Sequence, residues 1–332
     1  MLGLINKQHY CAQNAIRSRL AGLAIIACIS IIVFMTMGVK GQWGFVLPFR
    51  GSKLLAMMLV AISISVSSVL FHTITHNRVL TPSIMGFDAL YVLIQAITIF
   101  IFGMQAINNW HPSSVFVIET TIMTAFSVML FKWVFTGAMR SLHLVILVGI
   151  VFGLLFRSLS SFVLRMIDPN EFLILQDRMF ASFNSIHLDL IAIASLLIVV
   201  STVLAWRQRH MFDVLALGRQ TSINLGVPYG KAVMFTLLLI AVLVSVSTAL
   251  VGPVTFFGLL VSNLAYMLIP SSKHKHILPA SILIAVVFLV GGQTILERLL
   301  KLNTTISVVI ELIGGLMFIY LIIRKPRNDY RS

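Results

Sequence analysis

Two carboxylic acids in otherwise apolar stretches are the residues of this sequence best suited to chemistry. Asp88 stands in SIMGFDALYVLI, and Glu311 stands in ISVVIELIGGLM. An ionisable side chain in such surroundings costs free energy, so it usually binds a ligand, carries a proton or pairs with another polar group. We expect both acids, with Ser63 and Ser67 of an earlier apolar stretch, to serve a transport pathway or polar packing between helices.

Three other polar groupings resemble reactive sites only superficially. His72 and His76 have the spacing of helical zinc ligands, but the sequence offers no third ligand nearby. The run KHKH at 273–276 is typical of a solvated loop. The stretch GVPYGKA at 226–232 is one residue too short for a phosphate-binding loop and has Ala232 in place of Ser or Thr. We predict no catalytic residue, no metal site and no cofactor bound by this chain.

The composition requires a lipid environment. Of the 332 residues, 59% are hydrophobic and 10% are charged, and the mean hydropathy is +1.02. A soluble domain carries about 25% charged residues. The chain is therefore predicted to be an all-α polytopic membrane protein that forms a single transmembrane domain over residues 1–332, because no polar stretch is long enough to fold separately.

About ten stretches are long and apolar enough to cross a membrane, for which a helix needs roughly 20 residues. The first is too long for a signal peptide and no cleavage motif follows it, so we expect it to be retained. The eighth is short and follows Gly252-Pro253, where the chain should turn back. The predicted spans are Leu20–Val39, Leu54–Phe71, Ile84–Phe102, Val115–Phe135, Leu142–Leu159, Leu188–Trp206, Ala232–Leu250, Val254–Ile269, Ile277–Gly292 and Ile306–Ile323.

The basic residues indicate the orientation. With the N-terminus inside, sixteen Lys and Arg residues fall on the cytoplasmic side and eight on the outer side. This bias follows the positive-inside rule and places both termini in the cytoplasm. It also accounts for most of the net charge of +14. Because no contiguous basic soluble face is present, we predict no nucleic-acid partner.

The segment Asp213–Val227, DVLALGRQTSINLGV, is the most informative stretch. It lies between two long apolar runs, has an amphipathic helical pattern, and is divided into turns by Gly218 and Gly226. It is too polar for hydrocarbon and too patterned for a slack loop, so we expect it to dock on a partner at the cytoplasmic surface. The alternative is an interfacial helix that contacts lipid headgroups.

This segment resembles the coupling loop of a known family. Its pattern L-x-L-G-x-x-x-x-x-x-L-G-V is similar to that of permease subunits of ATP-binding-cassette (ABC) importers for iron-siderophores and cobalamin, the FecCD-like family. Three further stretches resemble family motifs in the same order: HNRVLTPSIMG at 76–86, VGPVTFFGLLVSNLAY at 251–266 and ISVVIELIGGLMFIYL at 306–321. With the basic segment described below, the resemblance extends from Leu47 to Leu321.

Two of these stretches depart from the family pattern. Arg78 stands where the family usually has a proline. Ser262 and Asn263 replace a Pro-His pair, and Tyr266 replaces an arginine. The departures leave the fold resemblance intact, but no role of the missing His and Arg can be assigned to this chain.

The resemblance implies a permease subunit that takes up ferric siderophore complexes across the bacterial inner membrane, and TPSIMGFDAL at 81–90 is similar to permeases for catecholate siderophores. The implied partners are an ATPase dimer that would bind ATP and Mg²⁺, a second permease subunit, a periplasmic or lipoprotein siderophore-binding protein, and membrane lipid. The chain itself would catalyse no covalent step. The residues implied to couple to the ATPase are Leu217, Gly218, Arg219, Gln220, Leu225 and Gly226.

The stretch LPFRGSKL at 47–54 resembles a basic segment with which the family receives acidic residues of the binding protein. It places Arg50 and Lys53 at the two basic positions, and Arg298 lies near a further one. Opposite charges would steer the encounter and fix its orientation. The alternative for these residues is ordinary charge flanking a membrane span.

Two other functional classes remain open from the residues alone. A proton-coupled secondary transporter would use Asp88 and Glu311 as a proton relay, but it would not need a docking element at 213–227. An intramembrane enzyme would need catalytic groups at one depth, and no paired-carboxylate or nucleophile–base motif is evident.

The predicted topology can be tested with reporter fusions. A reporter fused after Arg327 should be active only in the cytoplasm, and one fused after Asn108 only outside, because the basic residues retain their loops on the cytoplasmic side. The opposite activity at either site would contradict the ten-span arrangement.

Overall fold

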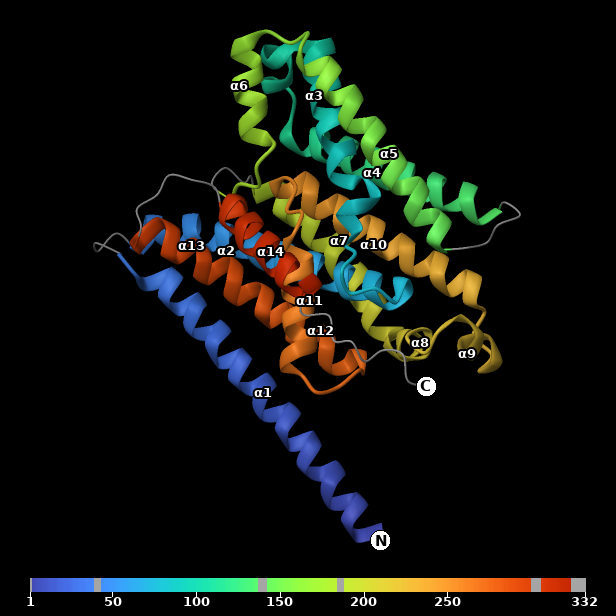
Figure 1. Ribbon diagram of the computed structural model, residues 1–332. Coiled ribbons are helices and arrows are strands. Elements are labelled where there is room, and N and C mark those ends of the chain that lie inside the picture. Colours follow the sequence, from blue (N-terminus) through green and yellow to red (C-terminus); the bar gives the residue numbers. More distant parts are fainter. Residues whose placement is uncertain (1, 39–42, 137–141, 184–187, 300–305, 324–332) are drawn as a thin grey trace.

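The computed structural model describes residues 2–38, 43–136, 142–183, 188–299 and 306–323 as helices joined by short connections (Figure 1). Among these residues, eight helices are long and apolar enough to cross a membrane, and two shorter apolar helices lie at 257–268 and 308–317. The ten segments correspond in order to the ten predicted spans. The all-α membrane fold is confirmed, and so is the short eighth segment.

The long spans include a continuous run at residues 274–299 in which α-helical and π-helical turns alternate.

Some residues named in the topology prediction lie outside the described residues, namely Val39, Lys40, Arg140, Lys301 and the basic residues beyond 323. The spans are α1 (Leu2–Thr36), α2 (Trp43–Thr75), α3 (Phe87–Asn108), α4 (Pro112–Thr136), α5 (Leu142–Leu164), α7 (Leu188–Arg207), α10 (Tyr229–Val251), α11 (Phe257–Leu268), the run of α12 (His274–Val286), η2 (Val287–Gly291), α13 (Gly292–Thr294) and η3 (Ile295–Leu299), and α14 (Ile306–Ile323). The connecting elements are η1 (Pro82–Met85), α6 (Pro169–Arg178), α8 (Arg209–Leu215) and α9 (Arg219–Asn224).

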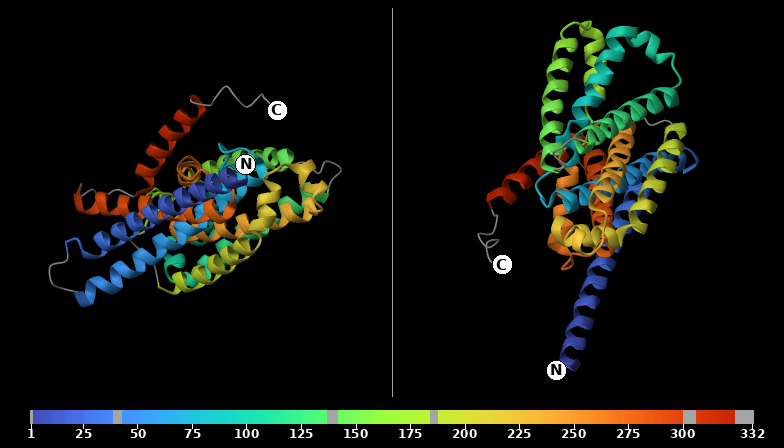
Figure 2. Two further views of the ribbon diagram at one scale, coloured as in Figure 1. Left: turned by 90° about the horizontal axis from the view of Figure 1, so that it is seen from below. Right: turned by 90° about the vertical axis from the view of Figure 1, so that its right-hand side faces the viewer.

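The bundle is organised around α10 and α2. Helix α10 packs against α2, α4 and α7, while α2 also contacts α11 and α12. Figures 1 and 2 show α3, α5 and α6 grouped at one end, and α1 projecting from the bundle toward the N-terminus. On α1 the side chains of Ile25, Ile29 and Ile32 are exposed. Apolar side chains thus cover the outer surface as well as the interior, as a bilayer requires.

Glycines let the chain before α3 lie directly against α5. Gly86 has a φ of +88°, and a Cβ at this position would lie 2.9 Å from the Cα of Gly153. A Cβ on Gly149 would come within 3.1 Å of Met85. Gly149 and Gly153 therefore permit the close approach that small residues provide in membranes. This contact fixes the start of α3, where Asp88 lies.

Two breaks interrupt the apolar helices. Helix α3 is broken at Gly103, which has a φ of +70°, and the Glu171 carboxylate on α6 accepts a 2.9 Å hydrogen bond from the Met104 N–H. Helix α10 ends at a Gly252 with φ of +98°, before α11 begins. The predicted turn after α10 is confirmed.

Candidate functional site

The predicted docking segment folds as two short helices, α8 and α9, joined by a glycine turn at the edge of the bundle (Figure 1). Gly218 precedes α9 with a φ of +99°, and Gly226 follows it with a φ of +82°. Glycine adopts such angles far more readily than other residues. A Cβ at either position would meet nothing within 4 Å. The two glycines are therefore required by the backbone conformation and not by lack of space.

Three apolar side chains of this segment face outward and form what we call the apolar tip. Leu217, Ile223 and Leu225 are 59%, 51% and 60% exposed. Ser222 of the same segment is buried, and its hydroxyl lies 2.9 and 2.7 Å from the carbonyl oxygens of Val214 on α8 and Gly218 in the turn. This contact holds α9 against α8. A fixed apolar surface on a polar connection is typical of a docking site.

Asp213 on α8 fastens the segment to the membrane spans. Its Oδ1 accepts hydrogen bonds from the backbone N–H of His274, at 2.8 Å, and from the Nδ1 of the same residue, at 2.7 Å. The Nε2 of His274 lies 2.7 Å from the Thr73 hydroxyl on α2. Asp213, His274 and Thr73 thus form a continuous polar connection from α8 through the start of α12 to α2.

This connection corrects the interpretation of residues 273–276 as a solvated loop at His274, whereas Lys273 and Lys275 are exposed as predicted. His274 is 3% exposed and begins α12. It can be buried because Asp213 and Thr73 supply its hydrogen-bond partners. Asp213 is the only acid in the docking segment, which is the signal that could have pointed to an internal partner.

A cavity of about 280 Å³ lies beside the connection. His72, His76, Tyr266 and His274 are among its lining residues. Among the described residues, no group of three or more His, Cys, Asp or Glu side chains could hold a metal ion. His72 and His76 therefore lack a third ligand of this kind in the part of the chain that the structure describes.

Two of the residues that depart from the family pattern, Arg78 and Tyr266, line this cavity. The Arg78 guanidinium lies over the Tyr266 ring, 4.5 Å from its centroid, which is within the range of a cation–π contact. The Nδ2 of Asn263 donates a 2.9 Å hydrogen bond to the Arg78 carbonyl oxygen. The substitutions are thus compatible with one another, and they join the loop before η1 to α11.

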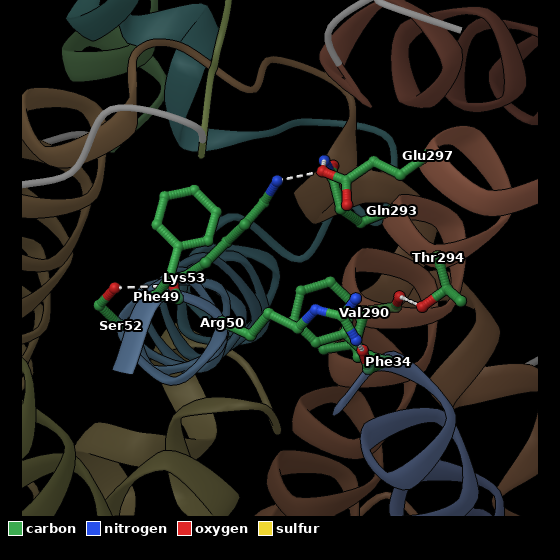
Figure 3. A network of polar contacts seen from close by, with 9 residues as sticks. All are labelled: Phe34, Phe49, Arg50, Ser52, Lys53, Val290, Gln293, Thr294 and Glu297. Atoms are coloured by element: carbon green, nitrogen blue, oxygen red, sulfur yellow. Dashed lines mark hydrogen bonds and ion pairs between the residues drawn. The ribbon is translucent and has the colours of Figure 1, made fainter. Parts of the chain in front are cut away.

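At the opposite end of α2, Arg50 is turned into the protein (Figure 3). It is 6% exposed. Its Nη1 donates hydrogen bonds of 2.9 to 3.0 Å to the carbonyl oxygens of Phe34, Met35 and Met37. These carbonyls lie at the end of α1, where a helix leaves acceptors unpaired. Arg50 therefore caps α1, and this contact occupies the guanidinium predicted to receive a binding protein.

Lys53 is also buried and forms an ion pair with Glu297 on η3 (Figure 3). The Nε2 of Gln293 donates a 2.7 Å hydrogen bond to the same Glu297 oxygen. Arg298, by contrast, is exposed and lies beside Gly38 near the end of α1. The structure brings the three predicted docking residues to one end of the bundle, but of these three only Arg298 is exposed. Sequence reasoning missed Glu297.

Asp88 lies in the first turn of α3 and is 8% exposed. Its Oδ2 accepts a 3.0 Å hydrogen bond from the Thr255 hydroxyl in the connection between α10 and α11. Its Oδ1 is buried without a hydrogen-bond partner among the described residues. Glu311 on α14 is close enough for its charge to interact with that of Asp88. Among the described residues no hydrogen bond joins the two predicted acids, and only this long-range repulsion links them.

The two predicted serines occupy different environments. The Ser63 hydroxyl donates a 2.6 Å hydrogen bond to the Leu243 carbonyl oxygen and so joins α2 to α10. The Ser67 hydroxyl donates to the Ile64 carbonyl oxygen at 3.1 Å and lines a small cavity together with Asp88. Ser63 is a packing contact between spans, and Ser67 belongs to the surroundings of Asp88.

Sequence reasoning also missed Glu119, a third acid within an apolar stretch. Glu119 on α4 is 6% exposed and accepts a 2.7 Å hydrogen bond from the Nε2 of Gln95 on α3. The criterion that selected Asp88, an acid within an apolar stretch, would have found it. Its place between two helices is consistent with polar packing.

The FecCD transport family matches residues 17–324 of the chain. The petrobactin import system permease protein YclO of Bacillus subtilis (strain 168) is 45% identical over 309 residues, which cover 93% of this chain and 97% of the relative. The petrobactin import system permease protein FatC of Bacillus anthracis is 35% identical over 272 residues, which cover 82% of this chain and 77% of the relative.

A solved structure of a metal-chelate type ABC transporter in an inward-facing conformation superposes with a TM-score of 0.81. The match has 19% sequence identity and covers 93% of this chain and 99% of the other. At this identity, the likeness concerns the fold alone.

The Lys53–Glu297 pair gives a first prediction about this site. Lys53→Ala should lower the free energy of unfolding by roughly 1–3 kcal/mol, because Glu297 would remain partly buried without its charged hydrogen-bond donor. Removing both charges with Lys53→Met and Glu297→Leu should recover most of the loss. Thermal unfolding of the purified chain in detergent measures the effect, with Arg298→Ala as the exposed control. Equal melting temperatures for Lys53→Ala and the unchanged chain would contradict a stabilising pair.

Proposed function

This chain belongs to the FecCD transport family, and we propose that it is the membrane permease subunit of an ABC importer for a ferric siderophore of the petrobactin kind. It crosses the membrane several times. Like the import-system permeases to which it is related, it is a transport component and not an enzyme. We place it in the bacterial inner membrane with both termini in the cytoplasm, in accordance with the distribution of Lys and Arg.

The observation that carries the proposal is the apolar tip on its glycine-shaped segment. Leu217, Ile223 and Leu225 are exposed on a short helical unit that Ser222 holds in one conformation. A fixed apolar surface on a short helix would fit a groove on a protein partner. The partner that the family membership provides is an ATPase subunit, which would hydrolyse ATP with Mg²⁺. Arg219 and Gln220 are exposed at the edge of the tip and would contribute polar contacts.

The Asp213–His274–Thr73 connection gives the tip a route to the membrane spans. A push on α8 by the closing ATPase would act on the start of α12 through Asp213, and on the end of α2 through His274. These two helices also pack against each other. A second permease subunit would complete the pathway, and its relative movement would switch access from the outside to the inside.

The substrate follows from the relatives rather than from a pocket in this chain. Both reported relatives are permease proteins of petrobactin import systems, and the first is similar over nearly the whole chain. We therefore propose petrobactin carrying iron as the substrate. A binding protein outside the membrane would deliver it.

The binding protein would dock at the end of the bundle that carries Arg298. Arg298 is exposed there and is available to an acidic residue. Arg50 and Lys53 would support the docking surface from behind, because they hold the end of α1 and η3 in place.

A proton-coupled secondary transporter is not supported. The chain matches the FecCD transport family, and the two relatives described above are permease proteins of import systems. Asp88 and Glu311 therefore need an explanation other than a proton relay that drives transport.

The coupling role of Gly226 can be tested by substitution. Gly226→Val should abolish substrate-stimulated ATP hydrolysis and transport, because a β-branched residue strongly disfavours a φ of +82° and would displace the tip. Arg219→Glu should cause only a partial loss, since a contact at the exposed rim is screened by solvent. Both activities would be measured in proteoliposomes with the ATPase bound.

Gly230→Val is the matched control for this experiment. Gly230 lies in the first turn of α10, and a Cβ there also meets nothing within 4 Å. The same side chain is therefore added without a positive φ. Normal coupling in Gly226→Val, with the ATPase bound, would make the segment a lipid-facing linker and remove the main support for the proposal.

The substrate can be tested by uptake. Cells that lack this gene should lose uptake of radioactive iron supplied as ferric petrobactin, and a plasmid copy should restore it, because the permease forms the membrane pathway for the chelate. A hydroxamate siderophore measured in parallel serves as the control. Unchanged petrobactin uptake with loss of the hydroxamate would assign the permease to another substrate.

A further inference from the structure

A small polar cavity surrounds Asp88 between the spans. Its volume is about 20 Å³, which is enough for one particle the size of a water molecule. It lies between α2, the start of α3, α10 and the connection to α11. The hydroxyl groups that line it belong to Ser67, Ser68, Thr81, Ser83, Ser247, Thr248 and Thr255.

Several of these hydroxyl groups can only accept a further hydrogen bond. Ser67 donates its proton to the Ile64 carbonyl oxygen, and Ser247 donates to the Val244 carbonyl oxygen. Thr255 donates to the Oδ2 of Asp88. Because a hydroxyl group has one proton, the oxygen lone pairs are what these groups can still offer. These three groups therefore present acceptors to the cavity, which suit an occupant that carries positive charge or donates hydrogen bonds.

Asp88 gives the cavity a specific charge requirement. Its Oδ1 is buried, makes no well-formed hydrogen bond with the described residues and belongs to a side chain that lines the cavity. The Ser83 hydroxyl, which also lines the cavity, lies near this carboxylate. Glu311 on α14 does not line the cavity, and its charge adds only a repulsion from a distance. Arg157 on α5 exerts an attraction from a distance, but it is exposed and forms no ion pair with Asp88 among the described residues. A buried charge without a close counter-charge is costly.

Two interruptions between helices, one before α3 and one between α10 and α11, bring backbone groups close to the cavity. Asp88 lies just after η1 and Gly86, and Thr255 lies in the connection between α10 and α11. In membrane transporters, interrupted helices of this kind bring side-chain and backbone oxygen atoms to bound ions. The local geometry thus agrees with the chemistry of the lining side chains.

We propose that this cavity binds one monovalent cation of the size of Na⁺, held by the Oδ1 of Asp88 and by the surrounding hydroxyl oxygens. One carboxylate balances one positive charge, and hard cations prefer oxygen ligands. The cavity is too small for a siderophore, and its acceptors would repel an anion. The ion would join α2, α3 and the α10–α11 connection, and its binding does not depend on the proposed substrate or partners.

Direct binding of radioactive sodium to the full chain in lipid nanodiscs tests the proposal. Choline chloride replaces sodium chloride, so that the ionic strength stays constant. Choline does not compete for the site, because it is too large for the cavity. Binding should saturate near one ion per chain, since the site has one carboxylate. Asp88→Asn should abolish it. Glu119→Gln is the matched control, because it removes a buried carboxylate elsewhere in the bundle, and it should bind sodium normally.

Two further measurements keep the test decisive if Asp88→Asn fails to fold. Thr255→Val removes one oxygen with little change of shape and should raise the half-saturating sodium concentration by about tenfold. The melting temperature of the unchanged chain should rise with sodium in place of choline, because a ligand that binds only the folded state stabilises it. Absence of saturable sodium binding would overturn the proposal. A melting temperature that depends on pH but not on sodium would assign a proton to Asp88, and dependence on neither would assign a water molecule; each result also overturns it.

Discussion

A polar group that is buried in a membrane protein loses its contact with water. It must then find a hydrogen-bond or charge partner within the protein, because hydrocarbon offers none. This requirement explains where the charged side chains of the bundle lie. Arg50 pairs with the carbonyl oxygens at the end of α1, and Glu171 pairs with the Met104 N–H where α3 is broken. Asp213 does the same for the first residue of α12. Each charge stands where helical backbone pairing ends.

The same requirement joins α2 to the helical run at residues 274–299, which extends from α12 to η3. The two are joined at both of their ends. At one end Thr73 contacts His274, and at the other Lys53 pairs with Glu297. The two helices also pack along the interval between these contacts. In the proposed mechanism, such a pair would move as one unit when the ATPase pushes on α8. A displacement at the apolar tip would then reach the end of the bundle that carries Arg298.

Exposed apolar surface has two meanings in this protein. On α1, α5 and α7 it covers long helical faces, as contact with lipid requires. At Leu217, Ile223 and Leu225 it is confined to a short segment that polar residues surround. The difference lies in the neighbouring residues and not in the side chains themselves, and it is the reason why we assign the tip to a protein partner.

The sequence by itself determined the all-α membrane fold, the order of the spans, the turn at Gly252-Pro253 and the position of the short amphipathic segment 213–227. These features depend on local properties, namely the hydropathy of consecutive residues and the backbone angles that Gly and Pro favour. The partners of the polar side chains were decided only by the tertiary structure. Lys53 and Glu297 are 244 residues apart in the chain, and Asp88 and Thr255 are 167 residues apart. The sequence therefore predicts exposed side chains for Arg50, Lys53 and His274. The structure buries them, because adjacent helices supply the carbonyl oxygens, carboxylates and hydroxyl groups that these side chains need.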